Sequence, residues 1–142
     1  MSVDDLLRAG RIRRERVSRA EIEQVLKLAD RDLRLARKIL RDDTDWGFAV
    51  AYNAVLQAGR AFMFARGYRP ATAEGHKNTF AFLLAAMDPE YEELITYFDR
   101  MRNKRNQAIY SMAGRVAETE ARNLLKQAGS FVRLIHGMLR NK

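Results

Sequence analysis

The sequence contains no cysteine among its 142 residues, which excludes disulfide bonds, thiol nucleophiles and cysteine-ligated zinc or iron–sulfur sites. It has only two prolines and eight glycines, and so few breaks favour long helices over many short strands. No apolar run approaches the ~18 residues that a membrane-spanning helix needs. We therefore expect no membrane association and, because the first residues are charged throughout rather than signal-like, a cytoplasmic location.

The charges that are present are unbalanced toward cations. Lysine and arginine number 26 against 18 aspartates and glutamates, so the net charge is +8. Most of these cations are arginines, whose planar guanidinium groups fork onto phosphates and stack on bases. Such an excess favours nucleic acid or another polyanion as a partner, but it does not identify one. Apolar residues make up 47% of the chain, which fits one folded domain.

Apolar residues recur at helical spacing through most of the chain, and capping residues divide it into helical segments. The expected helices cover residues 2–9, 18–42, 44–66, 74–87, 89–111 and 117–139. No β-strand, internal repeat or low-complexity segment is expected. The sequence thus predicts an all-α fold, an up-and-down bundle of four long helices plus a short N-terminal helix.

Several helix starts carry recognisable caps. Ser2 and Ser18 each precede an acidic residue by three positions, which is capping-box spacing. Thr44 or Asp45 is expected to cap the helix over residues 44–66, and Asp88 is expected to cap the helix that follows it. The helix over 44–66 is apolar on more than one face, so it is expected to be central in the bundle or to serve a dimer interface as well.

Residues 1–17 are predicted to form a short helix and a basic arm, separate from a helical bundle over residues 18–142. The stretch from Arg11 to Arg19 carries five arginines against Glu15 alone. It is either a mobile arm that contacts phosphate or a solvated linker.

Two arginines on the helix over 89–111 depart from the ordinary amphipathic pattern. Continued at helical spacing, its apolar line reaches Arg102 and Arg105, where an unpaired charge would be costly. Such arginines indicate a salt bridge, an interface or an anion site. A salt bridge from Arg105 could reach Glu118 or Glu120 of its own or of a partner subunit. Asn106 and Tyr110 lie one turn apart on the adjacent face and add polar groups.

The common catalytic motifs are missing. There is no HExxH sequence, no glycine-rich phosphate loop, and no serine with a histidine and acid arranged as a triad. No metal or cofactor is expected. His76 lies at a helix start, where a structural role is the commoner one, and its role is left open.

Five segments in order, residues 51–61, 67–70, 74–76, 102–110 and 118–121, together resemble a HEPN domain. The resemblance covers about residues 18–140. It implies a bundle of four or five helices that dimerises and brings two polar motifs into one cleft. Active members carry an arginine and, four to six residues later, a histidine, and cleave RNA without metal through the 2′-hydroxyl. Others work with a small nucleotidyltransferase or bind nucleotides or RNA without cutting.

Carried onto this sequence, the resemblance assigns the motif arginine to Arg105 and the polar residue after it to Asn106. The histidine position falls on Tyr110, a departure that matters because a phenol with pKa ~10 is a poor base near neutral pH.

The resulting prediction is a HEPN-like homodimer that binds RNA or a nucleotide, as a toxin–antitoxin or defence component working with a nucleotidyltransferase partner. The expected binding residues are Arg102, Arg105, Asn106 and Tyr110. Further candidates on the helix over 44–66 are Tyr52, Asn53 and Arg60. One alternative is a metal-independent endoribonuclease that uses Arg105 and Tyr110, with Asn106 beside them. The other is a non-catalytic dimerisation or interaction domain.

Overall fold

The computed structural model describes residues 1–110 and 116–140, and the side chains of residues 1–107 and 116–140. Its elements in chain order are α1 (Val3–Arg8), β1 (Ile12–Arg14), α2 (Arg19–Ile39), α3 (Thr44–Ala65), β2 (Tyr68–Pro70), α4 (Gly75–Ala86), a 3-10 turn η1 (Pro89–Tyr91), α5 (Glu92–Tyr110) and α6 (Glu118–Arg140). The predicted all-α fold is confirmed, with α2, α3, α5 and α6 as the four long helices. None of the described helices is long and apolar enough to cross a membrane.

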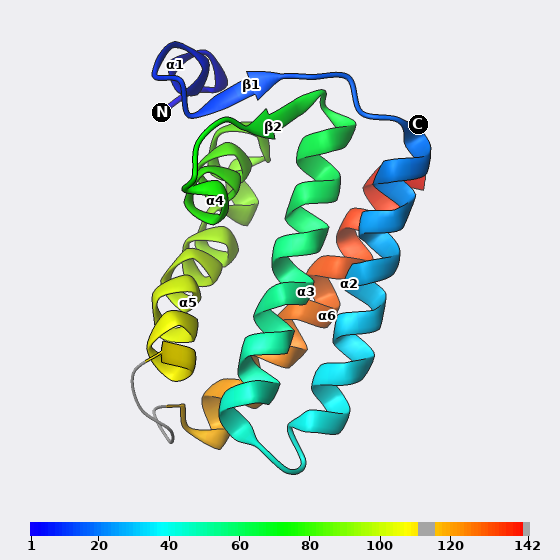
Figure 1. Cartoon of the computed structure of the whole chain (residues 1–142), viewed down its shortest axis with the longest axis vertical. Coiled ribbons are helices and arrows are strands. Elements are labelled where there is room, and N and C mark those ends of the chain that lie inside the picture. The colour runs from blue at the N-terminus through cyan, green and yellow to red at the C-terminus, as the bar shows by residue number, and fades with distance from the viewer. Residues whose placement is uncertain (111–115, 141–142) are drawn as a thin grey trace.

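Helix α3 forms the centre of the bundle. It packs against α2, α4, α5 and α6, which surround it on different sides (Figure 1). Its buried residues lie on several faces of the helix and include Phe48, Tyr52 and Phe62, because small alanines between them let the neighbouring helices approach closely. The prediction of a central helix buried on more than one side is therefore confirmed.

The helix caps are only partly as predicted. Ser2 and Asp5 form the reciprocal capping box at α1, and the Ser18 hydroxyl accepts a hydrogen bond from the Glu21 amide. The cap of α3 is Asp43, whose carboxylate accepts from the Trp46 amide at 2.9 Å, so the expectation of Thr44 or Asp45 was wrong. An acidic side chain three residues before an amide reaches it from the extended N-cap position, which Asp43 occupies.

The cap expected at Asp88 is also wrong in its detail. Asp88 makes no side-chain capping bond, and Pro89 begins a 3-10 turn that leads into α5. Proline has no N–H to leave unsatisfied at this position, so the turn forms without a side-chain acceptor.

The expectation that the chain has no strand is wrong. Strands β1 and β2 pair antiparallel, with Ile12 opposite Pro70 and Arg14 opposite Tyr68. Gly67, with φ of +87°, ends α3 and turns the chain into β2. The pairing joins segments far apart in sequence and only three residues long, so no local pattern announces it.

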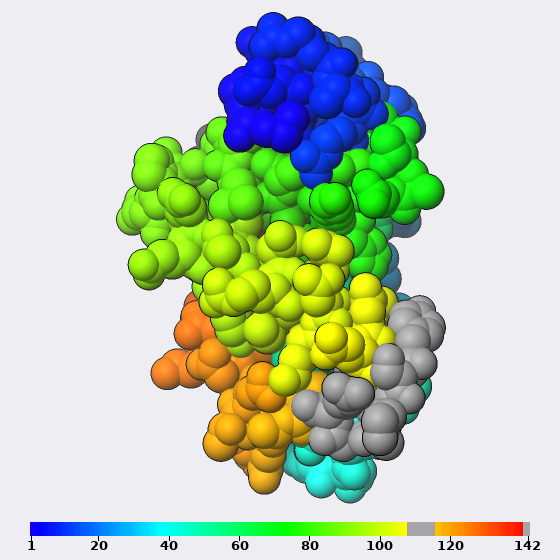
Figure 2. Space-filling model, turned by 90° about the vertical axis from the view of Figure 1, so that its left-hand side faces the viewer, coloured from blue at the N-terminus to red at the C-terminus, as the bar shows by residue number. Residues whose placement is uncertain are grey.

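The N-terminal segment packs against the bundle and not as a free arm. Leu6 and Ile12 are 0% and 2% exposed and belong to the same hydrophobic cluster as the long helices. Residues of α1 cover one end of the molecule (Figure 2), where they contact α4. Residues 12–14 are thus held in a strand, and the side chains of Arg13, Arg14, Arg16 and Arg19 are exposed. Contact of this stretch with phosphate stays a prediction. The division at residue 17 stays a prediction.

Candidate anion-binding site

A surface pocket of about 290 Å³ lies between the start of α4 and the C-terminal half of α5. We call it the α4–α5 pocket. It is lined by Ala73, Glu74, Gly75, His76, Lys77, Arg102, Arg105 and Asn106. Two of the three basic residues come from α5 and one from α4, and Glu74 is the one carboxylate in the lining.

The two arginines of α5 differ in how they are paired. Arg102 donates from Nε to the Asp99 carboxylate at 3.0 Å, and its side chain is 21% exposed. Arg105 forms no ion pair with any described residue, and its Nε is buried without a hydrogen-bond partner. Its one hydrogen bond to a described residue runs from Nη1 to Oδ1 of Asn106, at 3.4 Å. Because Arg105 lines the pocket and has no carboxylate partner among the described residues, its guanidinium charge is available to an external anion.

The first turn of α4 presents a second set of donors. Glu74 is the N-cap, and no side chain caps this helix. The amide of Asn78 bonds back to the Glu74 carbonyl, whereas the amides of Gly75, His76 and Lys77 have no acceptor among the described residues. Free N–H groups and the positive end of the helix dipole at this position favour an anion.

His76 connects the pocket to the core. Its Nδ1 lies 3.3 Å from the hydroxyl of Tyr52, which is fully buried in α3, and Arg105 lies over the Tyr52 ring at 5.7 Å. Burial, followed by the positive charges of Arg105, Arg60 and Arg102, lowers the pKa of His76 below its usual value. Burial also raises the pKa of the Tyr52 phenol, so this hydroxyl keeps its proton.

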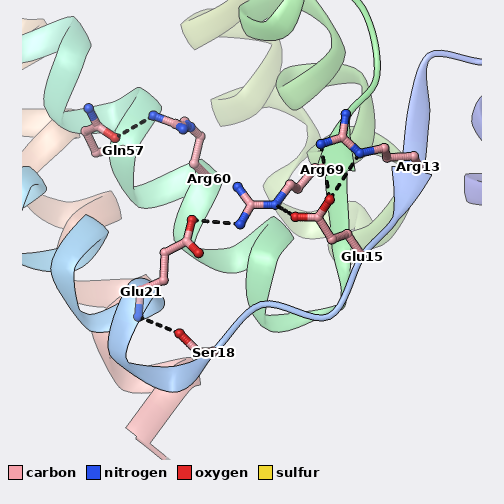
Figure 3. Close-up of polar contacts among 7 residues, drawn as sticks. All are labelled: Arg13, Glu15, Ser18, Glu21, Gln57, Arg60 and Arg69. Atoms are coloured by element: carbon pink, nitrogen blue, oxygen red, sulfur yellow. Dashed lines mark hydrogen bonds and ion pairs between the residues drawn. The ribbon is translucent and has the colours of Figure 1, made fainter.

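Arg60 lies on α3, next to a separate polar network between the start of α2 and β2 (Figure 3). It donates from Nη1 to Gln57 at 3.1 Å and stacks over Phe64. Beside it, Arg69 pairs with Glu21 at 2.7 Å and with Glu15. Arg60 does not line the α4–α5 pocket, yet it lies near enough for its charge to lower the pKa of His76.

The structure brings together three of the residues that the sequence singled out, namely Arg102, Arg105 and Asn106. Asn53 is half-buried on α3 and, like Arg60, does not line the pocket. The side chain of Tyr110 lies outside the described residues.

The alternative of a bridge from Arg105 to the start of α6 is not found. Glu118 pairs with Arg122 at 2.8 Å, and Glu120 pairs with Lys104 at 3.1 Å. Both carboxylates are thus satisfied by other cations, and Arg105 is left unpaired among the described residues.

Lys77 was missed by the sequence reasoning, and the role of His76 was left open. Tyr52 was one of the further candidates on α3, and it contacts both His76 and Arg105. The signal that could have found Lys77 and His76 is the short run Glu74-Gly75-His76-Lys77, which places a weakly capped helix start beside a histidine and a lysine. Its distance in sequence from residue 105 hides the contact.

A larger depression, of about 810 Å³, lies at the start of α5 and carries the opposite charge. Three glutamates, Glu90, Glu92 and Glu93, line it together with Arg100. This surface does not suit an anion. Within residues 1–110 and 116–140, no group of three or more histidine, aspartate or glutamate side chains is placed to hold a metal ion.

The fold defines a small helical-bundle protein with a donor-rich pocket between two of its helices. The model of the SAV_6107-like HEPN family matches residues 39–136, which is more than half of the chain. The protein therefore belongs to the HEPN family, whose functions are related to nucleotides and RNA. The match includes α3, α4 and α5, the helices that build the pocket and its floor. No curated protein and no solved structure matches the chain.

Proposed function

We propose that the protein binds the phosphate groups of RNA or of a nucleotide in the α4–α5 pocket. The observation that carries this proposal is the partly buried guanidinium of Arg105, unpaired among the described residues, beside the uncapped first turn of α4. A guanidinium and free helix amides are both good ligands for phosphate. Arg102, Asn106 and His76 line the same pocket and complete its wall.

The net charge of +8 supports a polyanionic partner. A homodimer, a nucleotidyltransferase partner, a toxin–antitoxin or defence role and a cytoplasmic location are further parts of the proposal. They rest on the family resemblance. The indole of Trp46 on α3 is 54% exposed, and a second chain could cover it.

The test is fluorescence anisotropy with a labelled single-stranded RNA about ten nucleotides long, with a chelator present, and with AMP as competitor. We expect Arg105→Ala to weaken binding about ten-fold or more, because a charge-assisted hydrogen bond to phosphate is lost. The matched control is Arg100→Ala, an exposed arginine on the same helix outside the pocket, which should change affinity less than about two-fold.

Equal losses in the two variants would mean that charge alone attracts the RNA, and the pocket would be rejected as the site. No binding of RNA or AMP by the parent protein would reject the proposal altogether. A gel of the same samples reads cleavage. Chelator-resistant cleavage that disappears in Arg105→Ala would replace the proposal with the endoribonuclease alternative.

A further inference from the structure

The contact between Tyr52 and His76 decides which ring nitrogen of His76 carries the proton. The Tyr52 hydroxyl is buried, and Nδ1 of His76 is its one hydrogen-bond partner among the described residues. A buried O–H needs an acceptor, and the neutral imidazole offers its lone pair at only one nitrogen. Tyr52 therefore donates to Nδ1, and the proton of neutral His76 sits on Nε2.

His76 in this tautomer is a hydrogen-bond donor at its second nitrogen. Nε2 has no partner among the described residues, and His76 lines the α4–α5 pocket. Protonation at Nδ1 would take away the acceptor of the Tyr52 hydroxyl, and this cost disfavours the charged form of His76. Burial and the nearby arginines also disfavour the charged form and lower the pKa of His76. His76 thus offers a neutral N–H and has no free lone pair with which to act as a base.

Asn106 adds further donors to the pocket. Its Oδ1 accepts a hydrogen bond from Nη1 of Arg105, and its amide NH₂ has no partner among the described residues. The pocket therefore presents donors from two helices. From α4 come the amides of Gly75, His76 and Lys77 and the Nε2–H of His76, and from α5 come the guanidinium nitrogens of Arg105 and the amide NH₂ of Asn106. The exposed carboxylate of Glu74 is the exception in this lining.

The number of donors and the charge exceed what one internal phosphodiester satisfies. Arg102 is ion-paired with Asp99, and the opposite charges of Glu74 and Lys77 cancel in the net charge of the lining. Arg105 and the positive helix end are left uncompensated within the described residues. A phosphodiester brings one negative charge and two free oxygens. A terminal phosphate brings three oxygens and a charge of about −1.5 to −2 at pH 7.

We propose that the α4–α5 pocket selects a terminal phosphate, a phosphomonoester dianion at the end of an RNA or on a mononucleotide, over the phosphodiester of a chain interior. This inference rests on the proposed function, since it specifies which phosphate that site holds. Tyr52 acts as a positioning residue, because it fixes the tautomer through which His76 donates to the ligand.

The experiment compares RNAs of one sequence, about ten nucleotides long, that end in a 5′-phosphate, a 3′-phosphate or hydroxyls at both ends. AMP, adenosine and inorganic phosphate are added as competitors. We expect a phosphorylated end to bind at least about five-fold more tightly than the hydroxyl form, with AMP competing and adenosine failing to compete. The 5′ and 3′ arms show which end is recognised.

The outcomes separate this inference from the proposed function. Equal binding of all three RNAs that still depends on Arg105 would overturn the selection of a terminal phosphate and leave the proposed function standing. Failure of every RNA and of AMP to bind would remove both. Competition by inorganic phosphate alone, with AMP no better than adenosine, would also overturn the inference, because a nucleotide-borne monoester would then be excluded from the pocket.

Variants at His76 test the donor role itself. Gln places an N–H donor near the position of Nε2, so we expect His76→Gln to keep most of the preference for a phosphorylated end and His76→Ala to lose it. Tyr52→Phe keeps the ring in the core but frees the tautomer, and the preference should fall about two- to five-fold. Circular dichroism of each variant shows whether it is folded. A preference unchanged in folded His76→Ala would contradict the donor role.

Discussion

Arg69 and Arg105 are both stacked on aromatic rings, but they differ in whether a carboxylate neutralises their charge. Arg69 lies over Phe64 and is held by two carboxylates from the segment before and within α2. Arg105 lies over Tyr52 and has no carboxylate among the described residues. Arg69 therefore links β2 to α2 and the segment before it, whereas the charge of Arg105 is available to a ligand.

This contrast predicts opposite effects on stability. Arg69→Ala should lower the free energy of unfolding by about 1–2 kcal/mol, because two ion-paired carboxylates lose their partner. Arg105→Ala should change it by less than about 1 kcal/mol, since the lost stacking is offset by removal of an unsatisfied buried donor. Urea denaturation measures both. A large loss in Arg105→Ala, without RNA or nucleotide binding by the parent, would favour the interaction-domain alternative.

The pKa of His76 predicts how stability depends on pH. Burial and the charges of Arg105, Arg60 and Arg102 make the folded protein take up this proton less readily than the unfolded chain does. The unfolded state therefore binds more protons just below the usual histidine pKa of about 6.5, and stability falls as the pH drops through that range. His76→Gln should flatten this part of the profile. Urea midpoints at about pH 7.5 and pH 5.5 give the slope, and equal slopes in parent and variant would contradict the assignment.

At the scale of elements, α3 passes close to the end of α2 at Gly47, near the start of α3. A Cβ at this position would lie 2.8 Å from the Cα of Leu40, the C-cap of α2. Backbone cannot move aside as a side chain can, so Gly47→Ala should destabilise the fold by about 1–3 kcal/mol. Gly137 in α6 has nothing near its missing Cβ, and Gly137→Ala should stabilise the protein by about 0.5–1 kcal/mol. Thermal melting of the two variants gives the change in Tm for each. If both variants change Tm in the same direction, the packing argument is refuted.

The elements also show what could be predicted from sequence. The long helices are recoverable because their apolar stripes and glycine stops are local signals, as the end of α3 at Gly67 demonstrates. Strands β1 and β2 are not, since each depends on a partner more than fifty residues away. The residues of the candidate site differ in the same way, because some are close in sequence and others meet only through packing. Arg102, Arg105 and Asn106 follow one helix and were found together, whereas His76 joins them only through the packing of α4 on α5.

At the scale of the whole molecule, the N-terminal segment shares one hydrophobic core with the long helices. Leu6 on α1 is fully buried, so Leu6→Ala should cost about 2–4 kcal/mol and shift a single unfolding transition. The exposed Leu35 on α2 provides the control, where alanine should change stability by less than about 0.5 kcal/mol. Chemical denaturation followed by circular dichroism and by Trp46 fluorescence tests this. Two separate transitions, or no loss in Leu6→Ala, would show that residues 1–17 are independent of the bundle.

The hydrogen bonds between the N-terminal segment and the residues around the start of α4 also determine when this segment can fold during synthesis. The Ala71 amide bonds to the Arg11 carbonyl, and Nε of Arg11 donates to Asn78 at 2.8 Å, across a separation of 67 residues. At the usual ~5–20 residues added each second, the first-made strand waits several seconds before its partner leaves the ribosome. The N-terminal segment therefore pairs only after β2 and the start of α4 have been made. The same pairing holds the residues just before α4, which line the α4–α5 pocket.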